Sequence, residues 1–123
     1  MQARRLVPLV DGRIESSGES FTKLAIVDAG LPVPEPQFWV EHRGRRLFRL
    51  DLAYPWLKIC VEYDGEEFHT SDEQREHDRR RRRWLRDNGW IVIVVTRESF
   101  AGDALLVWLR ELRNALEGRS LSR

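Results

Sequence analysis

The alternation of apolar and polar positions along the chain predicts one domain of mixed helices and strands. Helical spacing, strand-like runs and turn residues give a helix, three strands joined by short turns, a second helix, a fourth strand and a last helix. In chain order these elements cover residues 19–29, 37–42, 46–53, 57–64, 71–87, 90–96 and 103–118. We interpret residues 1–15 as a lead-in and residues 119–123 as a tail, so the expected domain spans residues 16–118.

The pattern also predicts how the strands pair. The strand over residues 90–96 is apolar throughout, which is typical of a sheet centre covered on both faces. It follows the third strand through a helix, so these two strands should be parallel, whereas the short turns make the first three strands antiparallel. A leucine stripe in the last helix should end at Gly118. The expected fold class is therefore α/β, with a mixed four-stranded sheet flanked by helices.

Composition narrows the class of protein. Hydrophobic residues make up 41% of the chain and charged residues 33%, which supports a packed core and excludes a disordered chain. Apolar runs fall short of the roughly 20 residues of a membrane span, and we expect no secretion signal and a cytoplasmic location. The single cysteine, Cys60, has no internal disulfide partner. Lys23 and Lys58 are the only lysines among 21 basic residues, so arginine supplies the rest.

Two carboxylates on neighbouring strands are the first candidate chemistry. If the turn near residues 55–57 is centred between its last two residues, Asp51 lies opposite Glu62, with Cβ atoms about 5 Å apart. The charges repel unless one is protonated or a cation such as Mg²⁺ lies between them. On spacing alone, an ion pair between Glu62 and either Arg46 or Arg49 is equally compatible. The position of the acidic face at the end of an apolar strand favours a bound ion.

A set of short motifs has a more specific meaning. The motifs are ES at 19–20, AGLP at 29–32, PQ at 36–37, LDLAYP at 50–55, VEYDG at 61–65, HT at 69–70, Asp78 before the arginine run, GW at 89–90 and VT at 95–96. Together they resemble an uncharacterised bacterial family that is similar to very-short-patch-repair (Vsr-like) endonucleases of the PD-(D/E)XK nuclease superfamily. The resemblance covers about residues 16–100 and implies a restriction-endonuclease-like core in the order αβββαβα.

The resemblance implies a metal-dependent nuclease, most simply a DNA endonuclease, with Mg²⁺ or Mn²⁺ as cofactor and DNA as partner. Asp51 matches the superfamily's metal-binding aspartate, and Glu62 matches its second acidic ligand. Glu19 matches an acidic residue of the first helix that supports the metal or a water. Asp64, which follows on the same strand face, is counted as a further metal ligand and catalytic residue.

Asp64 also departs from the superfamily pattern. Most members keep a lysine at this position, where it orients or deprotonates the attacking water. We expect His69 to handle the proton instead, because an imidazole pKa near 6.5 suits general acid or base chemistry. Lys23 is the alternative source of positive charge, since it lies one turn after Glu19 on the same helix face.

Several of these residues also have a purely structural interpretation. Glu19 fits a capping box with Ser16, in which it only bonds the start of the helix. His69 fits the surface of a turn, because a second capping box begins at Thr70. Gln37 fits an ordinary strand residue.

The helix over residues 71–87 is unusual because its first half is polar on the side expected to face the sheet. Such a half-helix can line a wet crevice, where arginines bind phosphates without reading sequence. The expected nucleic-acid contacts are Gln37, Arg79, Arg80, Arg82 and Arg83. The alternative is a solvated helix face with Glu76–Arg80 and Asp78–Arg82 pairs at i,i+4 spacing.

The competing hypothesis is a binding module that keeps the nuclease fold and does not cleave. It would be a DNA-binding or regulatory protein of the toxin–antitoxin type. The reason for this hypothesis is that the superfamily's usual lysine is replaced by Asp64. An additional DNA-targeting domain or partner is compatible with both hypotheses, and we expect no membrane association.

Overall fold

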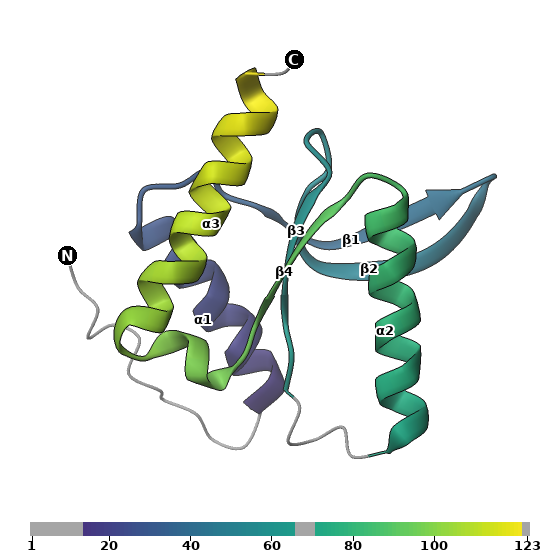
Figure 1. Cartoon of the computed structure of the whole chain (residues 1–123), viewed down its shortest axis with the longest axis horizontal. Coiled ribbons are helices and arrows are strands. Elements are labelled where there is room, and N and C mark those ends of the chain that lie inside the picture. The colour runs from purple at the N-terminus through teal and green to yellow at the C-terminus, as the bar shows by residue number, and fades with distance from the viewer. Residues whose placement is uncertain (1–13, 66–70, 122–123) are drawn as a thin grey trace.

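The computed structural model describes residues 14–65 and 71–121 as an α/β structure (Figure 1). The elements are α1 (Ile14–Asp28), β1 (Glu35–His42), β2 (Arg45–Tyr54), β3 (Ile59–Tyr63), α2 (Asp72–Asp87), β4 (Ile91–Val95), the 3-10 helix η3 (Arg97–Phe100) and α3 (Gly102–Leu121). The predicted order of helices and strands is confirmed, with η3 as an addition that the sequence pattern did not predict.

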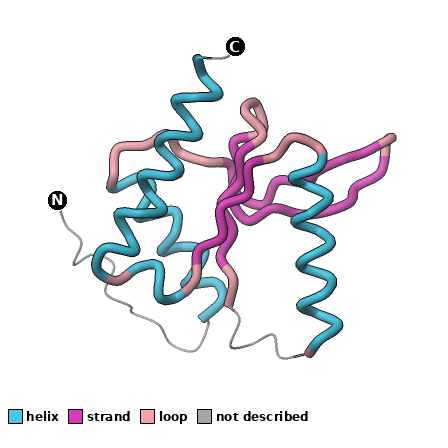
Figure 2. Tube along the Cα trace, viewed as in Figure 1, coloured by secondary structure: helices cyan, strands magenta, loops and turns pink. Residues whose placement is uncertain are grey.

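The four strands form a mixed sheet in the order β1-β2-β3-β4. The expected central position of the strand over residues 90–96 is therefore wrong, because β4 lies at an edge of the described sheet. β1 and β2 pair antiparallel, as do β2 and β3, whereas β3 and β4 are parallel, as the helical crossover predicts. Helices α1 and α3 cover one face and α2 covers the other, so the sheet is the central layer between the helices (Figure 2).

The face of the sheet under α1 and α3 is an apolar core. Val61 of β3 and Val95 of β4 are fully buried there against Leu112 of α3. Tyr54 at the end of β2 is buried in the same core and donates a hydrogen bond from its hydroxyl to the carbonyl of Pro32 (2.7 Å). Removing this apolar surface from water is the main contribution to stability on this face.

The face under α2 is apolar only toward the end of that helix. Leu85 is fully buried against Cys60 and Val92, and Trp84 packs edge-on against Phe48 with ring centroids 5.7 Å apart. One turn earlier, α2 places partly buried arginines over the sheet instead of apolar side chains. The middle of this helix is therefore polar on its sheet side, as the sequence predicts.

The hairpin of β1 and β2 extends beyond the rest of the sheet (Figure 1). β3 pairs with β2 over residues 52–54, so residues 38–50 form a two-stranded ribbon, named here the outer ribbon. Its turn is Arg43–Gly44, where both φ angles are positive (54° and 77°). This is the turn geometry whose twist matches that of the flanking strands.

The end of α3 differs from the prediction. The helix continues through Gly118 to Leu121, so the expected stop at Gly118 is wrong. Arg119, expected in a loose tail, donates hydrogen bonds to the carbonyls of Leu57 (2.8 Å) and Gly89 (2.9 Å), which anchor this last turn. Neither α3 nor another described helix combines the length and apolar character needed to cross a membrane.

Candidate functional site

The candidate site lies where β2 and β3 separate, a place that we call the fork. The last backbone pair between them is Leu52 with Val61, and continuing this register places Asp51 opposite Glu62. Here the strands are joined through side chains: the N–H of Tyr63 donates to Asp51 Oδ2 (3.0 Å), and the N–H of Asp51 donates to Glu62 Oε2 (3.4 Å). The predicted cross-strand position of the two carboxylates is therefore confirmed.

Asp51 lies in a setting that opposes its negative charge. Its pKa is raised from 3.8 to about 6, mainly because burial desolvates the carboxylate, and the charge of Glu62 adds to the rise. Glu19 raises the pKa as well, whereas the hydrogen bond from Tyr63 and the charge of Arg81 lower it. Two neighbouring carboxylates thus oppose the negative charge of Asp51, and a cation placed there would relieve this repulsion.

Glu62 has its own cationic partner. It is 3% exposed, and its Oε1 lies 2.5 Å from a guanidinium nitrogen of Arg81 on α2. Arg81 also donates to the carbonyl of Arg49 (3.4 Å) and lies over the ring of Phe48. Burial lowers the pKa of Arg81, but the bond to Glu62 and its charge outweigh burial and raise it. The alternative pairing of Glu62 with the side chain of Arg46 or Arg49 is wrong, because α2 supplies its ionic partner.

Gln37 links β1 to α1 at the same place. The register on either side, Pro36 with Leu52 and Phe38 with Leu50, places Gln37 opposite Asp51. Its φ is 54°, in the left-handed region that a glutamine rarely adopts, so Gln37 is not an ordinary strand residue. Such backbone strain is found where the surrounding structure imposes a local geometry, often at functional sites.

The side chain of Gln37 donates a hydrogen bond from Nε2 to Glu19 Oε2. α1 begins at Ile14, so Ser16 lies within the helix and the expected capping box at Ser16 is wrong. Glu19 instead reaches the sheet and acts electrostatically on Asp51. The structure therefore brings together Glu19, Gln37, Asp51 and Glu62, which were all predicted as site residues.

Asp64 is placed differently. Its N–H donates to the carbonyl of Val95 (2.8 Å), and its Oδ2 lies 3.5 Å from a guanidinium nitrogen of Arg82. The Nε of Arg82 is buried without a hydrogen-bond partner among the described residues. Asp64 is thus the ionic partner of Arg82, and it is not among the charges that shift the pKa of Asp51.

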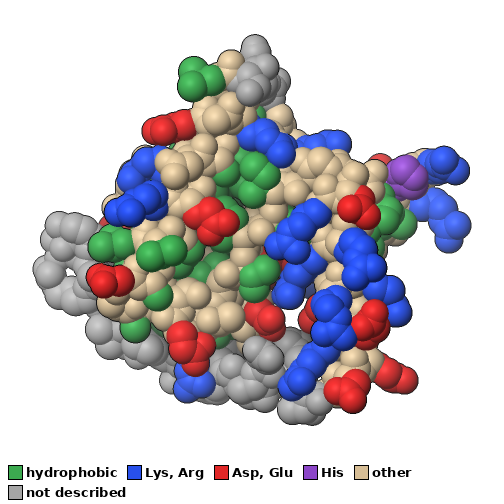
Figure 3. Space-filling view, viewed as in Figure 1, with side chains coloured by type: hydrophobic (Ala, Val, Ile, Leu, Met, Phe, Trp, Pro, Cys, Tyr) green, Lys and Arg blue, Asp and Glu red, His purple; other side chains and the backbone are tan. Residues whose placement is uncertain are grey.

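Further arginines of α2 are exposed to solvent. Arg79 and Arg80 are exposed and lie 2.6 Å and 3.9 Å from Glu76, so the predicted Glu76–Arg80 pair is confirmed, whereas the partner of Arg82 is Asp64 in place of Asp78. Arg83 is exposed. Figure 3 shows basic side chains along α2 with acidic ones among them. The expected catalytic residue His69 lies outside the described residues.

Sequence reasoning placed Arg81 on the helix face toward the sheet but missed it as the residue that contacts Glu62. The nucleic-acid contacts expected from the arginine run do not include it. Arg81 lies four residues before Leu85, and i,i+4 residues share a helix face. Since Leu85 is buried against the sheet, Arg81 must face the sheet one turn earlier.

The residues at the fork fit a hard divalent ion in their donor chemistry. No group of three His, Cys, Asp or Glu side chains is arranged to hold a metal in residues 18–65 and 71–121. Mg²⁺, however, keeps several waters and is bound through one or two carboxylates, which Asp51 and Glu62 can supply. Burial and the charges of Glu62 and Glu19 raise the pKa of Asp51, and Arg81 would have to share Glu62 with the ion.

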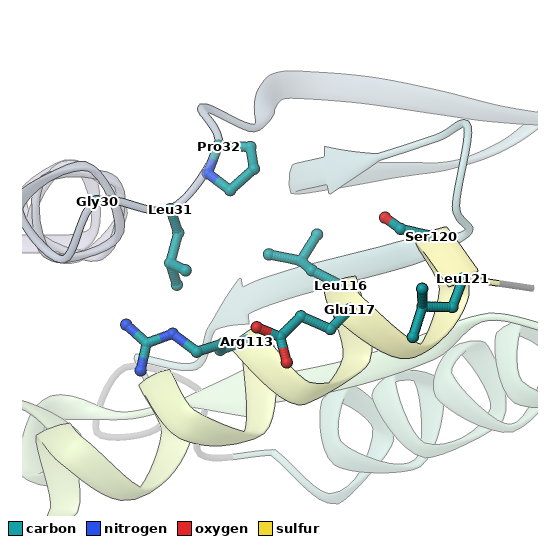
Figure 4. Close-up of a pocket in the computed structure, with 8 residues that line it drawn as sticks. All are labelled: Gly30, Leu31, Pro32, Arg113, Leu116, Glu117, Ser120 and Leu121. Atoms are coloured by element: carbon teal, nitrogen blue, oxygen red, sulfur yellow. The ribbon is translucent and has the colours of Figure 1, made fainter.

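A surface pocket of about 630 Å³ lies elsewhere, between the end of α3 and the connection after α1 (Figure 4). Its walls include Leu31 and Pro32 from the connection and Leu116 from α3, with Arg113 and Glu117 among the lining residues. None of the carboxylates at the fork lines it, so this pocket is separate from the candidate site.

Comparison with known proteins gives relatives without an assigned activity. The chain is 36% identical over 93 residues to an uncharacterised protein of Mycobacterium tuberculosis strain CDC 1551 / Oshkosh, and equally to one of strain ATCC 25618 / H37Rv. The alignment covers 76% of this chain and 34% of each relative, so the chain spans about a third of the length of the curated relatives it matches. No protein-family model and no solved structure matches the chain.

Proposed function

We propose that this protein is a metal-dependent nuclease that hydrolyses phosphodiester bonds, most simply a DNA endonuclease. The observation that supports it best is the pair of carboxylates at the fork of β2 and β3. Asp51 and Glu62 are held side by side by backbone hydrogen bonds, and burial together with the charge of Glu62 raises the pKa of Asp51. A fold retains such an arrangement at a cost in stability, which a functional cation would justify.

Asp51 and Glu62 would hold Mg²⁺ or Mn²⁺, with Glu19 close enough to act on Asp51 and to orient a water. The ion, when bound, polarises a phosphoryl oxygen and makes a bound water more acidic. Gln37 fixes Glu19 at the sheet through its side-chain hydrogen bond. Arg81, next to Glu62, places a permanent positive charge where a phosphate would approach the site.

The basic surface of α2 supports a nucleic-acid substrate. Arg79, Arg80 and Arg83 are exposed and lie along the same helix that covers Glu62 through Arg81. Arginine donates paired hydrogen bonds to phosphate, and such contacts position a duplex without reading its sequence. In this proposal Arg82 is a structural partner of Asp64, and Asp64 is at most an outer contributor to the metal site.

The test is DNA cleavage with substitutions that remove charge and keep shape. Purified protein is incubated with supercoiled plasmid and Mg²⁺ or Mn²⁺, and we expect nicked or linear product. Asp51→Asn and Glu62→Gln should each abolish cleavage, whereas Glu76→Gln, which removes an exposed carboxylate of α2, should not. Cleavage that survives both substitutions at the fork would refute the assignment.

Metal binding provides a readout that does not depend on turnover. Calorimetric titration with Mn²⁺ should show saturable binding to the unmodified protein and to Glu76→Gln. The signal should be lost in Asp51→Asn, whose folding is checked by circular dichroism.

One observation favours a second candidate, the non-cleaving DNA-binding module. Arg81 already neutralises Glu62 at 2.5 Å, which is what a fold that had lost its metal would be expected to do. In that case Mn²⁺ does not bind saturably, and DNA affinity is the same with and without chelator. These two results together would favour the binding module over the nuclease.

A further inference from the structure

The outer ribbon has one face that is packed and one that is open. Phe38 and Val40 of β1, with Phe48 and Leu50 of β2, belong to the apolar cluster under α2. Because side chains alternate along a strand, the residues between them turn to the opposite side. Trp39 is paired with Arg49 across the ribbon on that side, and both side chains are exposed.

This open face combines an aromatic surface with exposed arginines. Trp39 is 38% exposed, and the guanidinium of Arg46 lies over its ring, 5.2 Å from the centroid. Arg43, Arg45 and Arg49 are also exposed.

Among the residues that the structure describes, none of the four ribbon arginines (Arg43, Arg45, Arg46 and Arg49) forms an ion pair, although Glu41 lies across from Arg46 in the ladder. The exposed arginines Arg79 and Arg80 of α2 differ, because both share Glu76. Figure 3 shows the resulting basic cluster at the projecting end of the molecule. Guanidinium groups that form no ion pair are available to an external anion.

The ribbon also leads directly to the candidate site. Arg49 lies two residues from Asp51 on β2, and Trp39 lies two residues from Gln37 on β1. A strand rises about 3.4 Å per residue, so these pairs are roughly 7 Å apart along the strands. A polyanion bound along the open face would therefore come within about two residues of Asp51 and Gln37, whereas a small anion would need only one of these arginines.

We propose that the open face of the outer ribbon, formed by Trp39, Arg46 and Arg49 with Arg43 at the turn, is a docking surface for double-stranded DNA. A two-stranded ribbon has the width that the major groove of B-DNA admits. The arginines bind phosphates on the groove walls, and the stacked Trp39–Arg46 pair lies against the DNA between them. The inference rests on the proposed function only for the choice of DNA as the polyanion.

The test measures binding without cleavage, in EDTA, with a fluorescent DNA duplex and a series of salt concentrations. The variant Arg46→Gln/Arg49→Gln is compared with Arg110→Gln/Arg113→Gln, which removes two exposed arginines from α3 and changes the net charge equally. Each phosphate contact contributes about 0.9 to the slope of log K against log salt, so the ribbon variant should lower this slope by about 1.8. The α3 variant should leave both slope and affinity near those of the unmodified protein.

The proposal would be overturned if the two variants lost duplex affinity and salt slope equally, or if the slope were unchanged in the ribbon variant. Tighter binding of the matching single strand than of the duplex would also overturn it. Failure of the nuclease proposal gives a different result: no cleavage with Mg²⁺ or Mn²⁺, while the ribbon variant still loses its salt slope. Trp39→Ala, which removes an exposed ring, should weaken duplex binding. It should change the salt slope by less than the value of about 0.9 that one phosphate contact contributes.

Discussion

The two faces of the central sheet are built on different principles. Under α1 and α3, burial is apolar, with Val61, Val95 and Leu112 closed off from water. Under α2, apolar packing ends near Leu85, and the next turn toward the helix start places Arg81 over a buried carboxylate. The first face stabilises the fold through area removed from water, whereas the second face holds charges together in a poorly solvated place. The chemistry we propose lies at the edge of the second face.

The largest expected effect on stability comes from breaking the ion pair between Arg81 and Glu62 under α2. Arg81→Met leaves Glu62 buried without its cation, and we expect a loss of about 3–5 kcal/mol in the free energy of unfolding. The double variant Arg81→Met/Glu62→Gln should recover most of this loss, because the uncompensated charge is gone. Urea denaturation followed by tryptophan fluorescence measures both.

Two controls relate this effect to the comparison of faces. Arg79→Met, whose partner Glu76 is exposed, should change stability by less than about 0.5 kcal/mol. Leu112→Ala on the other face should cost about 2–5 kcal/mol through the cavity that it leaves. Loss without recovery in the double variant would show that Arg81 acts through packing rather than through charge.

The next effect depends on pH and concerns Asp51. The folded protein keeps a proton on this carboxyl up to about pH 6, whereas the unfolded chain releases it near pH 3.8. The folded state therefore binds more protons between these values, so stability falls as the pH rises through them and the loss is complete above about pH 6. Asp51→Asn removes this loss, so its stability relative to the unmodified protein should rise by about 2–3 kcal/mol between pH 4 and pH 8.

Denaturation curves across this pH range check the effect. Asp87→Asn, at an exposed position at the end of α2, is the matched control and should show no such trend. If an ion binds at the fork, excess Mg²⁺ should shrink the difference at pH 8. A stability difference that is independent of pH would mean that Asp51 is not held in an unfavourable state.

A smaller effect tests the packing on the α1 side of the site. A Cβ added at Gly18 would lie 2.3 Å from the ring of Tyr63, so either α1 or the ring must move. We expect Gly18→Ala to cost about 1–3 kcal/mol and to displace Glu19, which follows it in α1. In Gly118→Ala the new methyl group meets open space within a helix, so this control should gain about 0.5–1 kcal/mol.

Local patterns predicted the pairing of the strands better than the ends of the helices. The position of Asp51 opposite Glu62 follows from where a short turn is centred, because side chains alternate with a period of two. The end of α3 depends on contacts that are distant in sequence. Arg119 binds carbonyls of residues 57 and 89, which stabilises a helical turn after Gly118.

The candidate site shows the same division between local and distant information. The carboxylates are visible as motif residues, but the sequence does not reveal that β1 carries Gln37 in the left-handed region or that its amide reaches Glu19. It also does not separate Arg81 from Arg82 as partners of Glu62 and Asp64, since both precede Leu85 by a helical turn. That choice depends on where α2 lies on the sheet.

The smallest expected effect concerns the open face of the outer ribbon. Arg49→Gln should change the free energy of unfolding by less than about 0.5 kcal/mol, because its side chain is exposed and pairs with no described acid. Its backbone carbonyl, which accepts a hydrogen bond from Arg81, is unaffected by the substitution. The same change at Arg119 removes bonds to two carbonyls and should cost about 1–2 kcal/mol. Thermal and urea denaturation of the two variants therefore separate arginines that hold the fold from arginines available to a ligand. A large loss in Arg49→Gln would place the ribbon among the stabilising elements and remove the reason to look for a ligand there.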